Sequence, residues 1–149
     1  MRRILGDWQL SPIVRWQSGN RTTVTTGVDN ALTGLGGQRA VQILDDPYGT
    51  GGPTAFLNRA AFASPANGTY SSLAPFTVVN PNNLQNDFAL TRTFKLGGAQ
   101  SMQVRWEVFN LINHVNFNAP VASLNSASFG QILTAGDPRI MQFAVKFTY

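Results

Sequence analysis

The sequence has no cysteine, no long apolar run and few charged residues, and each shortage excludes a class of protein. Without cysteine, disulfide frameworks and thiolate metal sites are excluded. No stretch of 18 apolar residues occurs, which excludes a transmembrane helix. Charged residues make up 12% of the chain, about half the share usual in soluble proteins, yet hydrophobic residues reach 43%. Neutral polar residues and 14 glycines fill the difference, which indicates an all-β protein.

Catalytic, metal and nucleic-acid functions also lack the residues that they require. His114 is the single histidine, so zinc binding and histidine-based catalysis lack partners. No nucleophile–base pair can be identified, and we expect no enzyme, cofactor or metal. The net charge of +4 comes from basic residues scattered along the chain, with no patch of the kind that binds nucleic acid.

The first five residues do not form a signal peptide. Arg2 and Arg3 supply positive charge, but Gly6 and Asp7 interrupt the apolar stretch that should follow. For an exported protein this predicts that the chain is a fragment of a longer one or a truncated gene model.

Four segments alternate apolar and polar side chains with a period of two, the pattern of a β-strand with two unlike faces. In the first segment Trp8, Leu10, Val14 and Trp16 share one side, and tryptophan at both ends is typical of an aromatic girdle. On the apolar side of the second segment, Arg92 is the one exception. The predicted strands span residues of about 7–18, 86–96, 101–111 and 139–149.

Long and short connections alternate between these strands. Residues 19–85 and 112–138 are rich in glycine, proline and asparagine and are predicted to be long loops, whereas Gly97 and Gly98 predict a tight hairpin turn. Within the first loop, a short strand is predicted in 39–44 and a helical turn in 55–62. Its aromatic side chains could stack on sugars or grip a peptide, or pack the loop on itself; these are Phe56, Phe62, Tyr70 and Phe76.

Strand length favours a membrane barrel over a soluble sheet. All four segments have about ten residues, the length at which a tilted strand crosses a bilayer, whereas soluble strands usually have five or six. The predicted fold is therefore an all-β antiparallel meander of about four long strands, the C-terminal part of a transmembrane β-barrel with long extracellular loops. Its apolar face would meet lipid and its polar face would line the lumen. The lumen-facing candidates are Arg15, Lys95, Arg105, Glu107 and Lys146. The alternative is a soluble or surface-anchored β-sandwich binding module, which has the same periodicity.

Several motifs resemble one family of outer-membrane proteins. They lie at 8–11, 17–19, 58–62, 107–117, 129–132 and 137–143. Together they are similar to the C-terminal end of TonB-dependent receptors, in the Oar-like subfamily that carries an N-terminal carboxypeptidase-regulatory-like domain. Arg59 departs from the pattern, because many members have proline there.

This resemblance implies a barrel of about 22 strands with a plug in its lumen, of which the chain would supply the last four. It implies uptake of a scarce small-molecule, glycan or peptide substrate, with energy passed through TonB to the rest of the receptor. The plug and the TonB-contacting segment would lie outside this chain. The expected location is the outer membrane of a Gram-negative-type bacterium, with lipid as a partner and the C-terminus in the periplasm.

The end of the chain alternates apolar residues and finishes on an aromatic one. It resembles the signal by which the barrel-assembly machinery recognises its clients, and an open strand edge suits recognition by strand addition. The assembly-signal candidates are Phe143, Val145, Phe147 and Tyr149.

Overall fold

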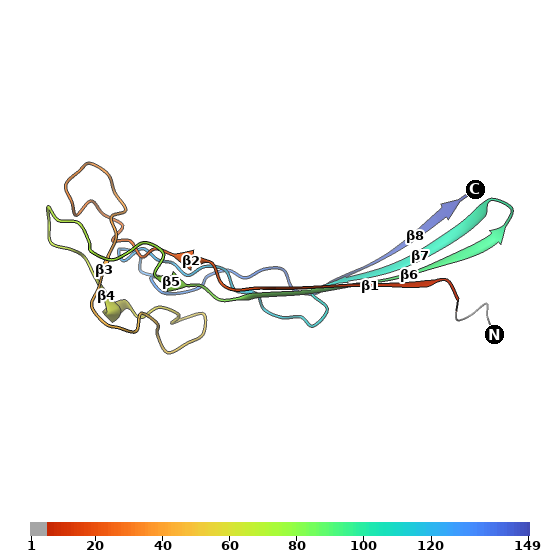
Figure 1. Cartoon of the computed structure of the whole chain (residues 1–149), viewed down its shortest axis with the longest axis horizontal. Coiled ribbons are helices and arrows are strands. Elements are labelled where there is room, and N and C mark those ends of the chain that lie inside the picture. The colour runs from red at the N-terminus through yellow and green to blue at the C-terminus, as the bar shows by residue number, and fades with distance from the viewer. Residues whose placement is uncertain (1–5) are drawn as a thin grey trace. The chain divides into compact units, whose positions relative to one another are not determined.

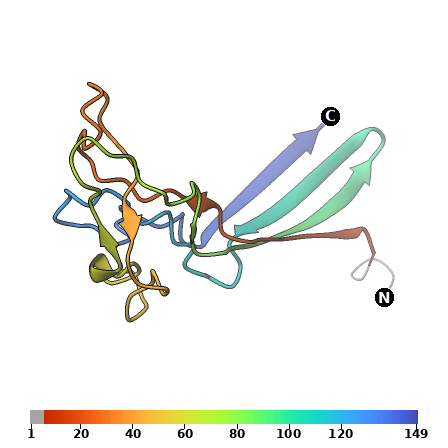
Figure 2. The same ribbon diagram turned by 60° about the vertical axis from the view of Figure 1, so that its left-hand side comes forward.

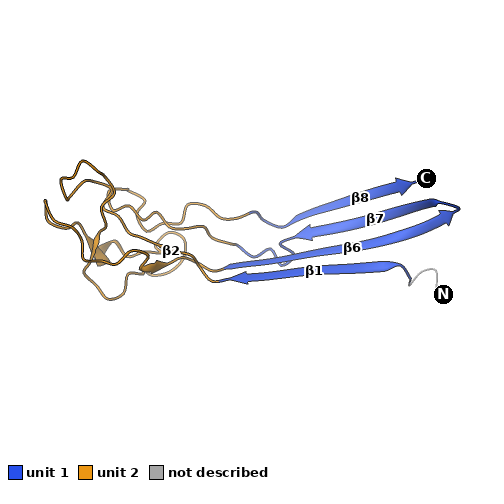
Figure 3. Cartoon of the chain, turned by 45° about the horizontal axis from the view of Figure 1, so that its top comes forward, with its two compact units in different colours: residues 1–17, 83–115, 137–149 blue, residues 18–82, 116–136 orange. Residues whose placement is uncertain are grey.

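The computed structural model describes residues 6–149, and these form two compact units (Figure 3). The sheet unit comprises the described residues up to 17 together with 83–115 and 137–149, and the loop unit comprises 18–82 and 116–136. The segment 1–5, which the sequence excludes as a signal peptide, lies outside the described residues. Among residues 6–149, no helix is long and apolar enough to cross a membrane.

The sheet unit contains one four-stranded antiparallel sheet (Figure 1). Its strands are β1 (Trp8–Gln17), β6 (Asn83–Gly97), β7 (Gln100–Phe109) and β8 (Ile140–Thr148), in the order β1-β6-β7-β8. This confirms the predicted antiparallel meander of long strands. β6 starts three residues earlier than the predicted residue 86, because Asn83, Leu84 and Gln85 continue the pairing with β1.

The β6–β7 connection is the tight turn that the two glycines predict. Gly97 ends β6 with φ 125°, and Gly98 follows with φ 58°, a backbone conformation that favours glycine. The start of β1 and the end of β8 lie at the same end of the sheet as this turn (Figures 1 and 2). The segments that connect β1 to β6 and β7 to β8 both leave the opposite end.

The sheet does not bury its own apolar side. β1 and β8 are exposed at every residue, and Leu10, Phe143 and Val145 are 63%, 76% and 68% exposed. Among the described residues of the sheet unit, Val108 is the one hydrophobic side chain that is buried. Four strands with one apolar face need a further covering, which lipid supplies to a barrel.

The β-sandwich alternative is wrong for the described chain. A sandwich needs a second sheet packed face to face on the first. The other two sheets in residues 6–149 are pairs of two-residue strands in the loop unit, and they are too small to cover a ten-residue face. They pair β2 (Arg21–Thr22) with β5 (Val78–Val79), and β3 (Val41–Gln42) with β4 (Phe62–Ala63).

The loop unit has a hydrophobic core of its own, which the sequence did not predict. The predicted short strand in 39–44 is β3, and the predicted helical turn is the 3-10 turn η1 (Arg59–Ala61). The core combines residues from both long connections: Val24, Ala40, Leu57, Ala61, Phe62, Val78, Leu124 and Phe129. The two predicted loops, 19–85 and 112–138, therefore fold together and are not independent. The unit that they form comprises residues 18–82 and 116–136.

Backbone hydrogen bonds join the two connections directly. Thr25 donates to the carbonyl of Ala122 at 2.9 Å and accepts from Leu124 at 2.9 Å. The carbonyl of Gly130 accepts from both Phe56 (2.9 Å) and Leu57 (3.0 Å). These bonds pair backbone groups of one connection with backbone groups of the other.

The aromatic residues of the first connection divide into two groups. Phe62 is buried and Phe56 packs against the core, so these two stabilise the loop unit. Tyr70 and Phe76 are 70% and 59% exposed and are available for contact with another molecule.

Asp29 organises an exposed turn of the loop unit. Its carboxylate accepts hydrogen bonds from the backbone N–H of Thr33 (3.1 Å) and of Gly34 (2.6 Å), and from the side chains of Thr33 and Gln38. The Thr33 backbone bond is the largest cause that lowers the pKa of Asp29. Desolvation acts in the opposite direction, and the other bonds add to the lowering.

Because the pKa of Asp29 is lower when folded than when unfolded, its contribution to the turn is complete above the unfolded value of about 4. That contribution is lost only as the pH falls through the lower folded pKa. We expect the hydrogen-exchange protection factors of Thr33 and Gly34 to stay constant from pH 7 to pH 5 and to decrease below about pH 4. Asp29→Asn should remove this pH dependence. Loss of protection already between pH 6 and pH 5 in the unsubstituted protein would contradict the assignment.

Candidate functional site

The candidate site is the polar face of the four-stranded sheet, on which the predicted lumen residues lie together. Residues paired across an antiparallel sheet project to the same side. Arg105 is paired with Thr91 and Ala144, and Glu107 with Ala89 and Gln142. The same register and the alternation along each strand place all five candidates on one face: Arg15, Lys95, Arg105, Glu107 and Lys146.

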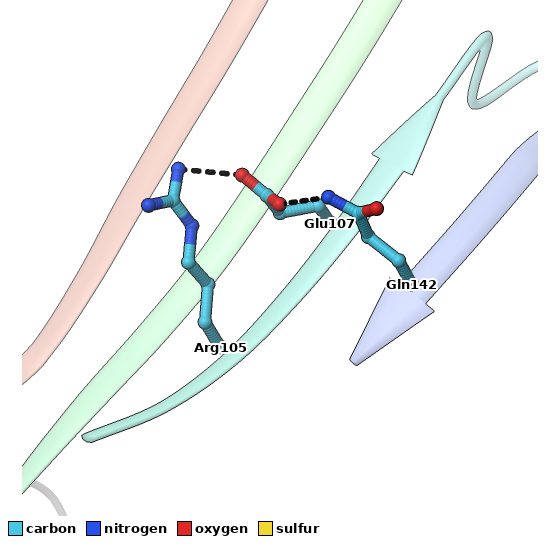
Figure 4. A network of polar contacts seen from close by, with 3 residues as sticks. All are labelled: Arg105, Glu107 and Gln142. Carbon is cyan, nitrogen blue, oxygen red and sulfur yellow. Dashed lines mark hydrogen bonds and ion pairs between the residues drawn. The ribbon is translucent and has the colours of Figure 1, made fainter. Parts of the chain in front are cut away.

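Glu107 is the centre of a polar network on this face (Figure 4). Arg105 Nη2 lies 2.5 Å from Glu107 Oε1, and the Gln142 amide donates to Oε2 of the same carboxylate. The side chain of Glu107 is 18% exposed and that of Arg105 is 49% exposed. An ion pair open to water contributes at most about 1 kcal/mol, so the network fixes side-chain direction more than it stabilises the fold.

A second network joins Arg15 to β6. Arg15 Nη2 donates to Gln85 Oε1 at 2.9 Å, and Gln85 Nε2 donates to Asp87 Oδ2 at 2.8 Å. Asp87 Oδ1 also accepts from the backbone N–H of Asn110 at 3.0 Å. Gln85, Asp87 and Gln142 were missed as site residues. Asp87 and Gln142 show the polar alternation, but Gln85 lies in a stretch predicted to be a loop.

The five candidates do not form one cluster. Arg105 contacts Glu107, whereas Arg15 contacts Gln85 instead. Lys95 and Lys146 lie toward the β6–β7 turn, opposite Ser101 and Gln103. The polar face carries four basic and two acidic side chains, an excess of two positive charges (4 − 2). The basic residues are Arg15, Lys95, Arg105 and Lys146, and the acidic residues are Asp87 and Glu107.

Asn110 fixes the chain where it leaves β7. This buried residue has φ 52°, and its side chain accepts from the His114 N–H (2.9 Å) and donates to the carbonyls of His114 (2.9 Å) and Asp137 (3.2 Å). Asparagine tolerates this left-handed conformation better than most residues. The bond to Asp137 holds the segment that enters β8 beside the end of β7.

His114 lies in the connection that follows β7, as predicted, and its backbone makes the contacts with Asn110. Within residues 6–149, no group of three or more His, Cys, Asp or Glu side chains is arranged to hold a metal ion.

The assembly-signal candidates lie on the opposite, apolar face or beyond it. Phe143, Val145 and Phe147 alternate along β8, and Tyr149 lies one residue past its end. Phe143 stacks on Trp106 with ring centroids 6.1 Å apart, and Phe147 stacks on Tyr149 at 6.4 Å. In the described chain β8 pairs with β7 alone, so its second edge carries no strand.

Comparison with protein families gives a match over most of the chain. A family model described as an outer membrane beta barrel domain matches residues 1–142, which include the whole of β1, β6 and β7 and the start of β8. Neither a curated protein nor a solved structure matches the chain. Because the match covers most of the chain and the sheet has the long strands and two unlike faces of a barrel wall, the chain belongs to the outer membrane β-barrel domain family.

Proposed function

We propose that the chain is the C-terminal wall of a TonB-dependent receptor that takes up a scarce nutrient across the outer membrane. The charged polar face is the observation that carries this proposal. Six ionisable side chains on one face of four strands suit a wall that meets water or another polar protein surface, such as a plug. The sequence motifs that resemble this receptor family support the same reading, and the subfamily proposed is the Oar-like one.

The proposed orientation follows from the lengths of the connections. In outer-membrane barrels the periplasmic turns are short and the extracellular connections are long. The β6–β7 turn is short, and the end of β8 lies at the same end of the sheet. We therefore place this turn and the C-terminus in the periplasm and the loop unit outside the cell.

In this orientation the two surfaces have different roles. The polar face would contact the plug or guide the substrate. The ion pair between Arg105 and Glu107 would fix the direction of both side chains for this contact. The exposed rings of Tyr70 and Phe76 would contact a glycan, peptide or small-molecule substrate outside the cell. β8 would present Phe143, Val145, Phe147 and Tyr149 to the barrel-assembly machinery.

The DNA upstream of Met1 tests the proposal. We expect a continuous reading frame that encodes further alternating strands of about ten residues and, before them, a plug domain with a TonB-contacting segment. The full-length product should then cross-link to TonB in energised cells, and deletion of that segment should abolish the cross-link. A stop codon and an unrelated gene immediately upstream would contradict the proposal.

A further inference from the structure

One arginine lies on the apolar face. Arg92 is paired with Trp8 of β1 and Val104 of β7, and it shares its side of β6 with Leu90 and Phe94. A charged side chain on the lipid side of a barrel costs about 2–4 kcal/mol at the middle of the bilayer and about 0–1 kcal/mol near its surface. A membrane-facing arginine is therefore expected close to a headgroup region, with an anion to receive its charge.

Arg92 is paired with Trp8, the first residue of β1, and tryptophan at a strand end is typical of the membrane interface. Arg92 lies five residues before Gly97 (97 − 92), at the end of the sheet that carries the β6–β7 turn. At a rise of about 3.3 Å per residue and a tilt of about 45°, this corresponds to roughly 12 Å along the bilayer normal from the turn. The long side chain can cover part of this distance by extending toward water.

Two aromatic rings hold the guanidinium group in place. Its central carbon lies 5.0 Å from the centroid of the Trp8 ring and 4.6 Å from that of Phe94. Both distances are within the range of a cation–π contact. The Trp8 and Phe94 rings thus orient the guanidinium group. The group has five N–H donors in a rigid planar arrangement, which allows it to bind a phosphate with two parallel hydrogen bonds.

A hollow in the apolar face adjoins Arg92 and the two rings beside it. It has a volume of about 270 Å³ and is lined by Leu90, Val104, Trp106 and Phe143 in addition to Arg92 and its two aromatic neighbours. The indole N–H of Trp106 is buried and has no hydrogen-bond acceptor within residues 6–149, although such groups usually find one. The hollow therefore combines an apolar lining with a cation at its margin.

We propose that Arg92, Trp8, Phe94 and the adjoining hollow bind one anionic glycerophospholipid of the surrounding bilayer. The phosphate would accept hydrogen bonds from the Arg92 guanidinium group, and an acyl chain would fill the hollow against Trp106 and Phe143. A glycerophospholipid fits better than a free phosphate ion, because the ion would leave the apolar hollow without an occupant. The leaflet is the periplasmic one, an assignment that rests on the orientation given under the proposed function.

The test is lipid retention by the full-length protein, measured by native mass spectrometry in detergent with added phosphatidylglycerol. Arg92→Gln should weaken retention about tenfold, the loss expected for charge-assisted hydrogen bonds. Arg92→Lys should weaken it less, because a point charge replaces the fork. Arg139→Gln is the matched control. It removes the same charge next to the first residue of β8, at the other end of the sheet, and should retain lipid as the unsubstituted protein does.

Three results would overturn the proposal: equal retention by Arg92→Gln and the unsubstituted protein, displacement of the lipid by millimolar inorganic phosphate, and a preference for lipid A over phosphatidylglycerol. Heat-modifiable gel mobility establishes that each variant is folded. Failure of the receptor proposal is separately visible, because the TonB cross-link would be absent while lipid retention still depended on Arg92.

Discussion

Leu10→Arg is expected to lower the free energy of unfolding of the full-length protein in phospholipid vesicles by more than about 1 kcal/mol, the upper end of the cost at the membrane surface. Leu10 belongs to the apolar row Leu10–Leu90–Trp106–Phe143 and lies two residues farther into the sheet than the Trp8–Arg92 pair. It is 63% exposed in the described chain, so an arginine there would meet no steric obstacle in water. The expected cost therefore comes from lipid, and the urea midpoint followed by heat-modifiable gel mobility measures it.

Ser11→Arg is the matched control for this substitution. Ser11 is the next residue of β1, is also exposed, and lies on the polar face opposite Ala89. We expect it to change the free energy of unfolding by no more than about 0.5 kcal/mol, as for other surface substitutions. Equal effects of the two substitutions would contradict the assignment of the apolar face to lipid.

Gly130→Ala is expected to destabilise the loop unit by more than about 2 kcal/mol. Gly130 has φ +81°, and a Cβ atom there would lie 2.4 Å from the backbone oxygen of Leu57. Relief of this clash would break the hydrogen bonds from Phe56 and Leu57 to the Gly130 carbonyl, which join the two long connections. Hydrogen exchange of the Phe56 and Leu57 amides should accelerate accordingly, while exchange in the four long strands stays unchanged.

Gly51→Ala separates this clash from the cost of the backbone conformation. Gly51 has φ +89°, but a Cβ atom there would have no neighbour within 4 Å. An alanine in the left-handed region costs about 1–2 kcal/mol, so Gly51→Ala should have the smaller effect and leave the Phe56 and Leu57 amides protected. If both variants exchange alike, the contact between Gly130 and Leu57 does not hold the loop unit together.

The four long strands could be predicted from the sequence because a barrel strand repeats one simple pattern. Alternation with a period of two placed the five lumen-facing candidates on one face without knowledge of the pairing. The start of β6 was missed because asparagine is rare in strands, and only the pairing with β1 extends the strand to Asn83. The partners within the polar networks, such as Gln142 for Glu107, depend on a strand register that no local pattern specifies.

The loop unit could not be predicted because its contacts join residues that are far apart in the sequence. Leu57 and Gly130 are in contact, as are Thr25 and Ala122, and neither pair belongs to a periodic segment. Its core residues, such as Val24, Ala40 and Leu124, lie in stretches without a sustained period. Such a sequence resembles an unstructured connection until both segments are brought together.

The most direct test of the barrel-wall account is spin-label accessibility along β8. Residues 1–149 contain no cysteine, so a single cysteine introduced in this chain is a unique attachment site there. In the full-length protein in lipid vesicles, labels at Val145 and Phe147 should be relaxed by lipid-soluble oxygen, and labels at Ala144 and Lys146 by a water-soluble nickel complex. This alternation with a period of two is the predicted result. Labels at all four positions that are reached equally by the water-soluble complex would contradict the account.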